Sequence, residues 1–203
     1  LPADLTGTDI FRPETGDFTF QAGPIFNSLI LADEINRAPA KVQAAMLEAM
    51  AEKQVTAGRK TYPLPELFLV MATQNPIEQE GTYPLPEAQL DRFLVRIDVG
   101  YPDLETEREI LLSTTGEAEC EAENVFSADE LLAAQALLRR MPVGEGVMES
   151  ILDLVRAFRP ESDSASEAVR ESVAWGPGPR ASQAFMMTVR ARALLQGRLV
   201  PDA

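Results

Sequence analysis

Two short apolar runs constrain the fold of this chain more than any other feature of its sequence. Residues 28–32 are followed directly by Asp33 and Glu34, and residues 67–72 are followed closely by Asn75. Neither run alternates between apolar and polar side chains, and both are bounded by polar or turn residues, which is typical of strands buried on both faces of a parallel sheet. The runs predict that the first half of the chain is an α/β unit.

The residues between and after these runs complete an α/β pattern. A helix is predicted from Pro39, because apolar side chains recur at helical spacing and proline suits the first helical turn. Residues 54–56 and 60–62 flank a turn centred on Gly58, which predicts a short hairpin. Residues 93–99 alternate in part and predict a third strand. The order strand, helix, hairpin, strand, loop and strand is that of an α/β domain.

The second half of the chain predicts helices alone. Apolar residues at helical spacing predict helices over residues 103–114, after Ser127, over residues 145–158, around Val169 and over residues 180–196. Glu130 lies three residues after Ser127, as in a capping box. Acidic residues between Gly116 and Asn124 show no apolar period, which predicts an exposed linker. The predicted organisation is an α/β part over 1–100, a connecting helix and acidic linker over 101–126, and a helical domain over 127–203.

Charge and composition exclude several classes of function. The formal net charge is −14, from 32 acidic and 18 basic residues, which argues against a nucleic-acid backbone or an anionic membrane as the main partner. The chain has no histidine and a single cysteine, Cys120, so histidine-based catalysis and cysteine-rich metal sites are excluded. No apolar run approaches the roughly 20 residues that a membrane helix needs. We therefore expect a cytoplasmic protein whose partner is another protein.

Polar residues at the ends of the two buried strands are candidates for phosphate chemistry. Asp33 could hold Mg²⁺ through water and Glu34 could activate a nucleophilic water. The alternative is that both acids face solvent or cap the next helix. The Asn75 amide is donor and acceptor together, so it could bind both a γ-phosphate oxygen and the attacking water. The alternative is that Asn75 and Pro76 only open a turn.

Two arginines complete the candidate set. Arg92 stands where a helix is predicted to lead into a strand, and its guanidinium could reach a phosphate on a neighbouring subunit. The alternative for Arg92 is a salt bridge to Asp91 or another nearby acid. Arg180 follows a rigid Gly-Pro turn at the start of a predicted helix, where the helix dipole disfavours a cation. An anionic partner is therefore expected at Arg180.

The order of these four features resembles that of the MoxR family of AAA+ ATPases, and the resemblance covers nearly the whole chain. The segments that carry it are residues 31–38 (LADEINRA), similar to Walker B, residues 73–78 (TQNPIE), similar to sensor 1, residues 81–93 (GTYPLPEAQLDRF), similar to the arginine-finger stretch, and residues 175–182 (WGPGPRAS), similar to sensor 2. The resemblance implies that residues 1–100 are a partial AAA+ parallel-sheet core and that an all-α lid domain follows.

The family resemblance implies a role for each candidate residue. It implies ATP and Mg²⁺ as cofactors, with Asp33 helping to hold Mg²⁺ and Glu34 polarising the hydrolytic water. It implies that Asn75 is sensor 1 and that Arg180 is sensor 2, acting in cis from the lid. Arg92 would be the finger that acts in trans on the nucleotide of the next subunit. A finger acting in trans implies a ring of subunits, expected to be a hexamer.

The resemblance also implies partners. Members of the family are chaperone-like ATPases that assemble or activate protein complexes, often together with a von Willebrand A-domain protein. The hairpin around Gly58 corresponds to the family's pre-sensor-1 insertion, and residues 18–24 correspond to its helix-2 insertion. Both insertions are expected to project from the core and to act on a protein client.

The chain departs from the family pattern at the phosphate-binding loop. AAA+ ATPases hold phosphates with a G-x-x-x-x-G-K-[ST] loop, but Lys41, Lys53 and Lys60, the lysines of this chain, each follow a residue other than glycine. We therefore expect a fragment that is inactive alone and that exposes apolar surface, which invites self-association. The alternatives are a phosphate loop on a separate chain and a non-catalytic remnant that serves as a protein-interaction module. A DNA-acting relative is disfavoured by the net charge.

Overall fold

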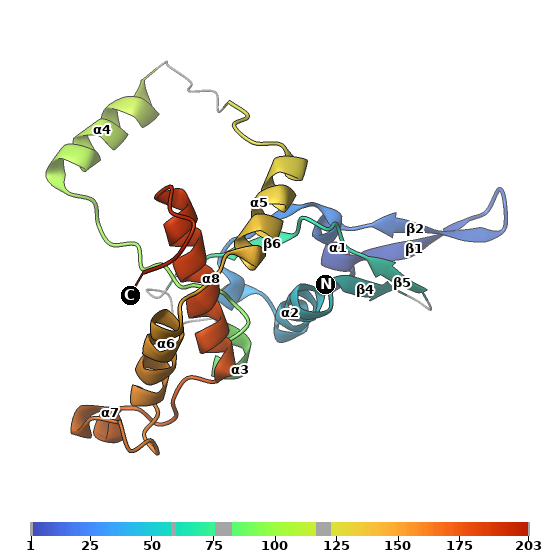
Figure 1. Ribbon diagram of the computed structural model, residues 1–203. Coiled ribbons are helices and arrows are strands. Elements are labelled where there is room, and N and C mark those ends of the chain that lie inside the picture. The colour runs from blue at the N-terminus through green and yellow to red at the C-terminus, as the bar shows by residue number, and fades with distance from the viewer. Residues whose placement is uncertain (1, 58–59, 76–82, 117–122, 203) are drawn as a thin grey trace.

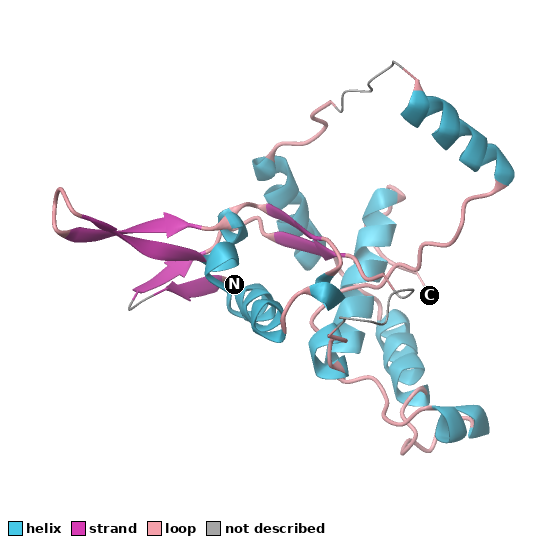
Figure 2. Cartoon of the chain, turned by 180° about the vertical axis from the view of Figure 1, so that it is seen from behind, coloured by secondary structure: helices cyan, strands magenta, loops and turns pink. Residues whose placement is uncertain are grey.

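A computed structural model describes residues 2–57, 60–75, 83–116 and 123–202 of the chain (Figures 1 and 2). Two parallel strands, β3 (Leu29–Ala32) and β6 (Leu69–Ala72), confirm the predicted α/β class. Their register runs from Leu29 opposite Leu69 to Ala32 opposite Ala72. Because the strands are parallel, their carboxyl ends meet at one edge of the sheet, and the residues that follow them lie there together.

The two faces of this sheet have different surroundings. Ala32, Val70 and Ala72 share one face and pack against the hydrophobic core. On the opposite face the outward side chains are 50–65% exposed: Leu29, Leu31, Leu69 and Met71. Burial on both faces is therefore a wrong prediction for the described part of the chain, whereas the expected exposure of apolar surface is confirmed.

Helix α2 (Ala40–Glu52) packs at the centre of the core and confirms the helix predicted from Pro39. It follows a short 3-10 turn, η2 (Ile35–Arg37), and buries Gln43, Met46, Leu47 and Ala49 on one side. The rest of the core comes from several elements: Ile25, Ile35, Val55, Leu64 and Leu85. The helix thereby shares one core with Ile35, which follows β3, and with Leu85, which lies in the predicted arginine-finger stretch.

The predicted hairpin after α2 is confirmed. Strands β4 (Gln54–Ala57) and β5 (Lys60–Pro63) pair antiparallel, with Val55 opposite Tyr62. The turn at Gly58 and Arg59 lies outside the described residues.

A second hairpin near the N-terminus was not predicted from the sequence. After α1 (Pro2–Thr6), strands β1 (Gly7–Arg12) and β2 (Asp17–Ala22) pair antiparallel and extend away from the body of the molecule (Figure 1). The 3-10 turn η1 (Pro24–Phe26) follows β2. Phe20 of β2 stacks on Tyr62 of β5 with ring centroids 4.1 Å apart, so an aromatic contact joins the two hairpins.

The strand predicted over residues 93–99 is wrong. The short helix α3 (Glu87–Leu90) precedes this segment, and the segment itself is irregular and exposed, with Ile97 and Val99 at 79% and 90%. A strand needs a neighbour for its backbone N–H and C=O groups. Within the described ranges, the parallel sheet has only β3 and β6, and residues 93–99 pair with neither.

Helices are the regular secondary structure of the described residues in the second half, as predicted. The helices are α4 (Leu104–Thr115), α5 (Ala128–Arg140), α6 (Glu145–Ala157), α7 (Glu167–Ser172) and α8 (Pro179–Leu195). Helix α8 packs against both α5 and α6, and α6 buries Val147, Ile151 and Val155. Residues 117–122 of the predicted acidic linker lie outside the described part.

Helix α4 stands apart from the other helices in both views (Figures 1 and 2) and buries none of its residues. Its large apolar side chains, such as Leu104 and Leu112, are exposed. In the described ranges, no helix combines the length and the apolar character that crossing a bilayer requires.

Candidate functional site

The residues that follow β3 form a tight loop, residues 33–36, which we call the acidic loop. Glu34 adopts a left-handed backbone conformation, with φ 47° and ψ 52°. For a residue with a β-carbon this conformation costs about 1–2 kcal/mol. Such cost is often found at functional sites, where the surrounding contacts maintain it. The contacts around Glu34 therefore define the candidate site.

Thr73, the residue after β6, contacts both acids through one oxygen. Its hydroxyl Oγ1 donates to Asp33 Oδ1 at 2.6 Å and accepts from the backbone N–H of Glu34 at 2.8 Å. The backbone of Thr73 continues the parallel pairing, because its N–H donates to the Ala32 carbonyl and its carbonyl accepts from the Ile35 N–H. The ends of both strands are thus fixed to each other beside the two acids.

The Glu34 carboxylate has a cationic neighbour within its own loop. Arg37 Nη1 lies 2.7 Å from Glu34 Oε2, in a partly exposed ion pair. Because solvent reaches both groups, this pair contributes only about 0–1 kcal/mol to stability. The carboxylate is therefore oriented by Arg37 and remains accessible to water.

Asn75 lies beside the acidic loop. We call residues 73–75 the Asn75 loop. The side-chain N–H of Asn36 donates to the Asn75 carbonyl at 3.2 Å, and the Asn36 carbonyl accepts from the Tyr83 N–H. The structure thus brings Asp33, Glu34 and Asn75 to one edge of the sheet. Residues 76–82, which include part of the matched segments, lie outside the described residues.

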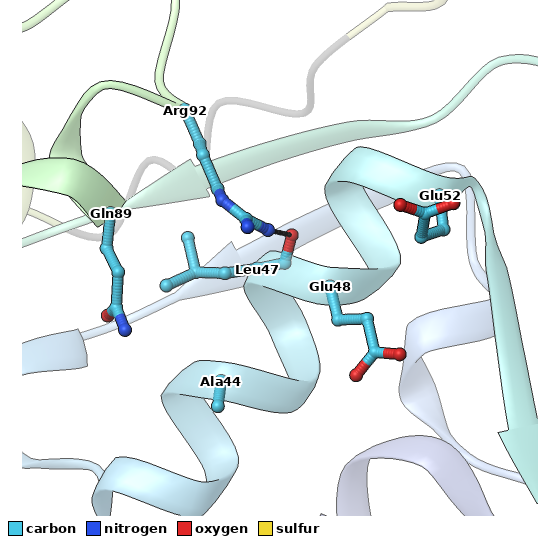
Figure 3. Close-up of a pocket in the computed structure, with 6 residues that line it drawn as sticks. All are labelled: Ala44, Leu47, Glu48, Glu52, Gln89 and Arg92. Carbon is cyan, nitrogen blue, oxygen red and sulfur yellow. Dashed lines mark hydrogen bonds between the residues drawn. The ribbon is translucent and has the colours of Figure 1, made fainter.

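Arg92 contacts helix α2. Its Nη1 donates to the Leu47 carbonyl at 2.7 Å, in a pocket also lined by Glu48, Glu52 and Gln89 (Figure 3). This contact is with a backbone carbonyl, so the salt bridge to Asp91 or another nearby acid is not the contact described for Arg92, and a phosphate contact stays a prediction. Arg92 is therefore held by helix α2 of its own subunit.

Arg180 lies at the N-terminus of α8, next to Pro179, as the sequence predicted. Its Nη1 lies 3.5 Å from Asp91 Oδ2, so the expected anionic partner is supplied by the chain itself. A groove beside this ion pair is lined by Trp175 and Glu87, among others. The contact joins the start of α8 to the end of α3, and the structure does not bring Arg180 to the acidic loop.

Comparisons with known proteins agree on one family. Residues 1–95 match the model of the ATPase family associated with various cellular activities (AAA). The chaperone MoxR1 of Mycobacterium tuberculosis is 45% identical over 198 residues, which cover 98% of this chain and 52% of MoxR1. The uncharacterised protein YeaC of Bacillus subtilis is 40% identical over 100% of this chain and 61% of YeaC. The chain belongs to the MoxR family of AAA+ ATPases.

A solved structure agrees with this assignment. The crystal structure of a candidate ATPase from Cytophaga hutchinsonii superposes on this MoxR-family chain with a TM-score of 0.89 and 41% identity, covering 100% of this chain and 62% of that one. The family resemblance and the partial AAA+ core with a helical part are thereby confirmed. The chain spans about half to three fifths of the length of these relatives.

Sequence reasoning about the MoxR-family chain missed two residues that shape the acidic loop. Thr73 was seen only as part of the segment around Asn75, although a hydroxyl directly after a buried strand is a usable signal. Gln43 is 2% exposed, and its Nε2 donates to the carbonyls of Ile35 and Tyr83. A polar residue on the apolar side of a helix is the sequence signal for such a bridge.

The donor set of the acidic loop fits the Mg²⁺ that this family uses. Asp33 offers a hard carboxylate oxygen, and Mg²⁺ is commonly held by one or two carboxylates together with waters and substrate phosphates. The described residues contain no cluster of three or more metal-ligating side chains. These residues suit a Mg²⁺ ion that binds together with nucleotide better than one coordinated by protein side chains alone.

Proposed function

We propose that this MoxR-family chain supplies the hydrolytic and sensing residues of a chaperone-like AAA+ ATPase that remodels, assembles or activates protein complexes. The observation that carries the proposal is the contact of one hydroxyl with both acids of the acidic loop, beside Asn75. This contact holds the Asp33 carboxylate and the backbone of Glu34, the proposed base, at the carboxyl edge of a parallel sheet, where ligands of α/β folds commonly bind.

Each residue has a distinct role in this proposal. Asp33 holds Mg²⁺, which would neutralise phosphate charge when bound. Glu34 accepts the proton of the attacking water at its carboxylate, and Asn75 orients that water against the γ-phosphate. Arg180 contacts the nucleotide in cis after leaving Asp91.

Arg92 acts in trans on the neighbouring subunit in this proposal, which requires a ring, proposed to be a hexamer. Its contact with the Leu47 carbonyl supports a trans role, because the contacts described for Arg92 include neither Asp33 nor Glu34 of its own subunit. A protein client is supported by the net charge of −14, which disfavours nucleic acid. A von Willebrand A-domain partner and a cytoplasmic location complete the proposal.

The test joins the phosphate-loop segment of a MoxR relative to this chain, giving what we call the loop-completed protein. We expect it to hydrolyse ATP, whereas the chain alone shows no measurable Mg·ATP binding by calorimetry. We expect Glu34→Gln to abolish hydrolysis and to leave ATP binding in place. Glu149→Gln, on the exposed side of α6, is the matched control and should hydrolyse normally.

The same experiment distinguishes the proposed ATPase from the rival interpretation, a non-catalytic interaction module. Absence of hydrolysis in a folded loop-completed protein that binds ATP would favour the non-catalytic interaction module. Micromolar ATP binding by the chain alone would contradict the assignment of the phosphate contacts to a segment outside this sequence.

A further inference from the structure

We propose that Thr73 is a positioning residue that holds Asp33 and the Glu34 backbone in their working arrangement, an inference that rests on the proposed function of those acids. The reason is that Thr73 lies beside both Asp33 and Glu34. The Thr73 hydroxyl is within hydrogen-bond distance of both consecutive residues, at 2.6 Å and 2.8 Å. These two contacts come from a residue that is distant in sequence, so they form only in the folded molecule.

The direction of the two hydrogen bonds follows from the chemistry of the groups. A hydroxyl has one proton to donate and two lone pairs with which to accept. The Asp33 carboxylate can only accept, so it receives that proton, and a lone pair of the same oxygen receives the Glu34 N–H. No other arrangement satisfies both partners, so the hydroxyl links the carboxylate of one acid to the backbone of the next.

The hydrogen bond between Glu34 and Thr73 acts at a residue whose backbone conformation is energetically costly. Glu34 has φ 47°, and the hydrogen bond of its N–H to Thr73 favours this left-handed conformation over its alternatives. The Thr73 backbone is itself paired with Ala32 and Ile35, so its hydroxyl starts from a fixed place. A β-branched side chain also has few rotamers, which keeps the hydroxyl aimed at both acids.

The same residue connects the acids to the Asn75 loop. Asn75 lies two residues after Thr73, and Asn36 of the acidic loop donates to its carbonyl. Thr73 thus joins Asn75 to the acidic loop through its own backbone and hydroxyl.

The first test uses the chain as it exists. Amide hydrogen exchange is followed by NMR in the wild type, in Thr73→Val, which keeps the shape and removes the hydroxyl, and in Thr73→Ser, which keeps the hydroxyl. We expect Thr73→Val to speed exchange at the Glu34 amide by about two- to tenfold, the effect of one lost hydrogen bond. Thr73→Ser should stay close to the wild type. The Ile35 amide, which bonds to the Thr73 backbone, is the internal reference and should not change.

Three results would overturn the proposal. They are an unchanged Glu34 amide in Thr73→Val, equal rates in Thr73→Val and Thr73→Ser, and equal acceleration at Ile35, which would mean general loosening. If Thr73→Val does not fold, Thr73→Ala provides the same comparison with Thr73→Ser.

Hydrolysis by the loop-completed protein gives an independent measurement. Loss of a residue that orients a metal ligand or base costs about 10- to 100-fold in activity. We expect that loss in kcat for Thr73→Val with little change in KM for ATP, and near recovery in Thr73→Ser. If Glu34→Gln abolishes hydrolysis but Thr73→Val does not lower it, the positioning role fails and the proposed function stands. If Glu34→Gln hydrolyses normally, the proposed function itself fails.

Discussion

At the scale of single residues, the acidic loop contains an uncommon choice. Glycine would adopt φ 47° without steric cost, yet a glutamate occupies position 34. Contacts with Thr73 and Arg37 offset the cost of that conformation. An unfavourable backbone held by specific side chains is the structural argument that Glu34 does more than end a strand.

The backbone cost of Glu34 can be measured by two substitutions. We expect Glu34→Gly to be more stable than Glu34→Ala by about 1 kcal/mol, because only alanine retains the steric cost of the left-handed conformation. Both variants lose the ion pair with Arg37, so the pair cancels in the comparison. Urea unfolding provides the measurement.

The matched control for this comparison is Glu149 in the interior of α6. There the order should reverse, with the alanine variant about 1 kcal/mol more stable than the glycine variant. An alanine variant at position 34 that is more stable than the glycine variant would contradict the left-handed conformation.

The trans role of Arg92 predicts a result in mixed rings. In the loop-completed protein, Arg92→Ala and Glu34→Gln should each lack hydrolysis alone. Random mixing should restore activity at about a quarter of the subunit interfaces, because each head-to-tail interface draws one side from each subunit. Hydrolysis rate against mixing ratio is the measurement. A mixture as inactive as both parents, under conditions where rings form, would rule out action in trans.

At the scale of elements, the helix ends were the most predictable features. Ser127 and Glu130 form the predicted capping box at α5, with the Ser127 N–H donating to Glu130 at 2.8 Å. Gly197 follows the C-cap of α8 in a left-handed conformation, which is typical of glycine at that position. Such caps depend on residues a few positions apart, so the sequence contains all the information that they need.

The capping box predicts how α5 responds to pH. The hydrogen bonds from the Ser127 backbone and hydroxyl lower the pKa of Glu130. A carboxyl whose pKa is lowered by folding stabilises the folded state above its unfolded pKa, about 4.3, and this contribution is lost as the pH falls through the lower folded value. Helix content near α5 should therefore decrease in that acid range, as followed by NMR chemical shifts at several pH values.

Two variants test this response of α5. Glu130→Gln should weaken the pH dependence, since the amide does not titrate there. Ser127→Ala should cost about 1 kcal/mol at neutral pH. A pH profile of α5 that Glu130→Gln leaves unchanged would assign the effect to another acid.

The elements that sequence reasoning missed depend on distant partners. Residues 93–99 have a strand-like pattern, but a strand forms only where a neighbour pairs with its backbone, and no described segment does so. The β1–β2 hairpin was missed because a contact that supports it joins distant residues. Phe20 stacks on Tyr62, and the two are 42 positions apart in the sequence. The pattern of neighbouring residues shows neither whether a strand has a pairing partner nor whether two distant rings stack.

At the scale of the whole molecule, the described residues expose many large apolar side chains. The outward face of β3 and β6 is exposed, as are residues 94–99 and α4. Large exposed apolar patches are uncommon on monomeric soluble proteins. The surface, together with the outer edges of the β3–β6 sheet, with which no described segment pairs, favours association.

This surface predicts self-association of the isolated chain. Sedimentation velocity at increasing concentration should show species larger than a monomer. Replacing Leu31 and Met71 by glutamine should reduce the association, because both side chains lie on the outward sheet face. Leu195→Gln, at an 89% exposed position at the end of α8, is the control and should not. A chain that remains a clean monomer at high concentration would contradict the prediction.

By itself, the sequence determined the α/β class, the two parallel strands, most of the helices and the family, because these depend on short apolar periods, local caps and literal motifs. Only the tertiary structure decided that Thr73 touches both acids, that Arg180 pairs with Asp91 and that Arg92 is held by Leu47. It also decided that residues 93–99 remain unpaired. The physical reason is the same in each case, since a hydrogen bond or ion pair between distant residues depends on where the chain brings them, and that placement is set by packing of the whole molecule.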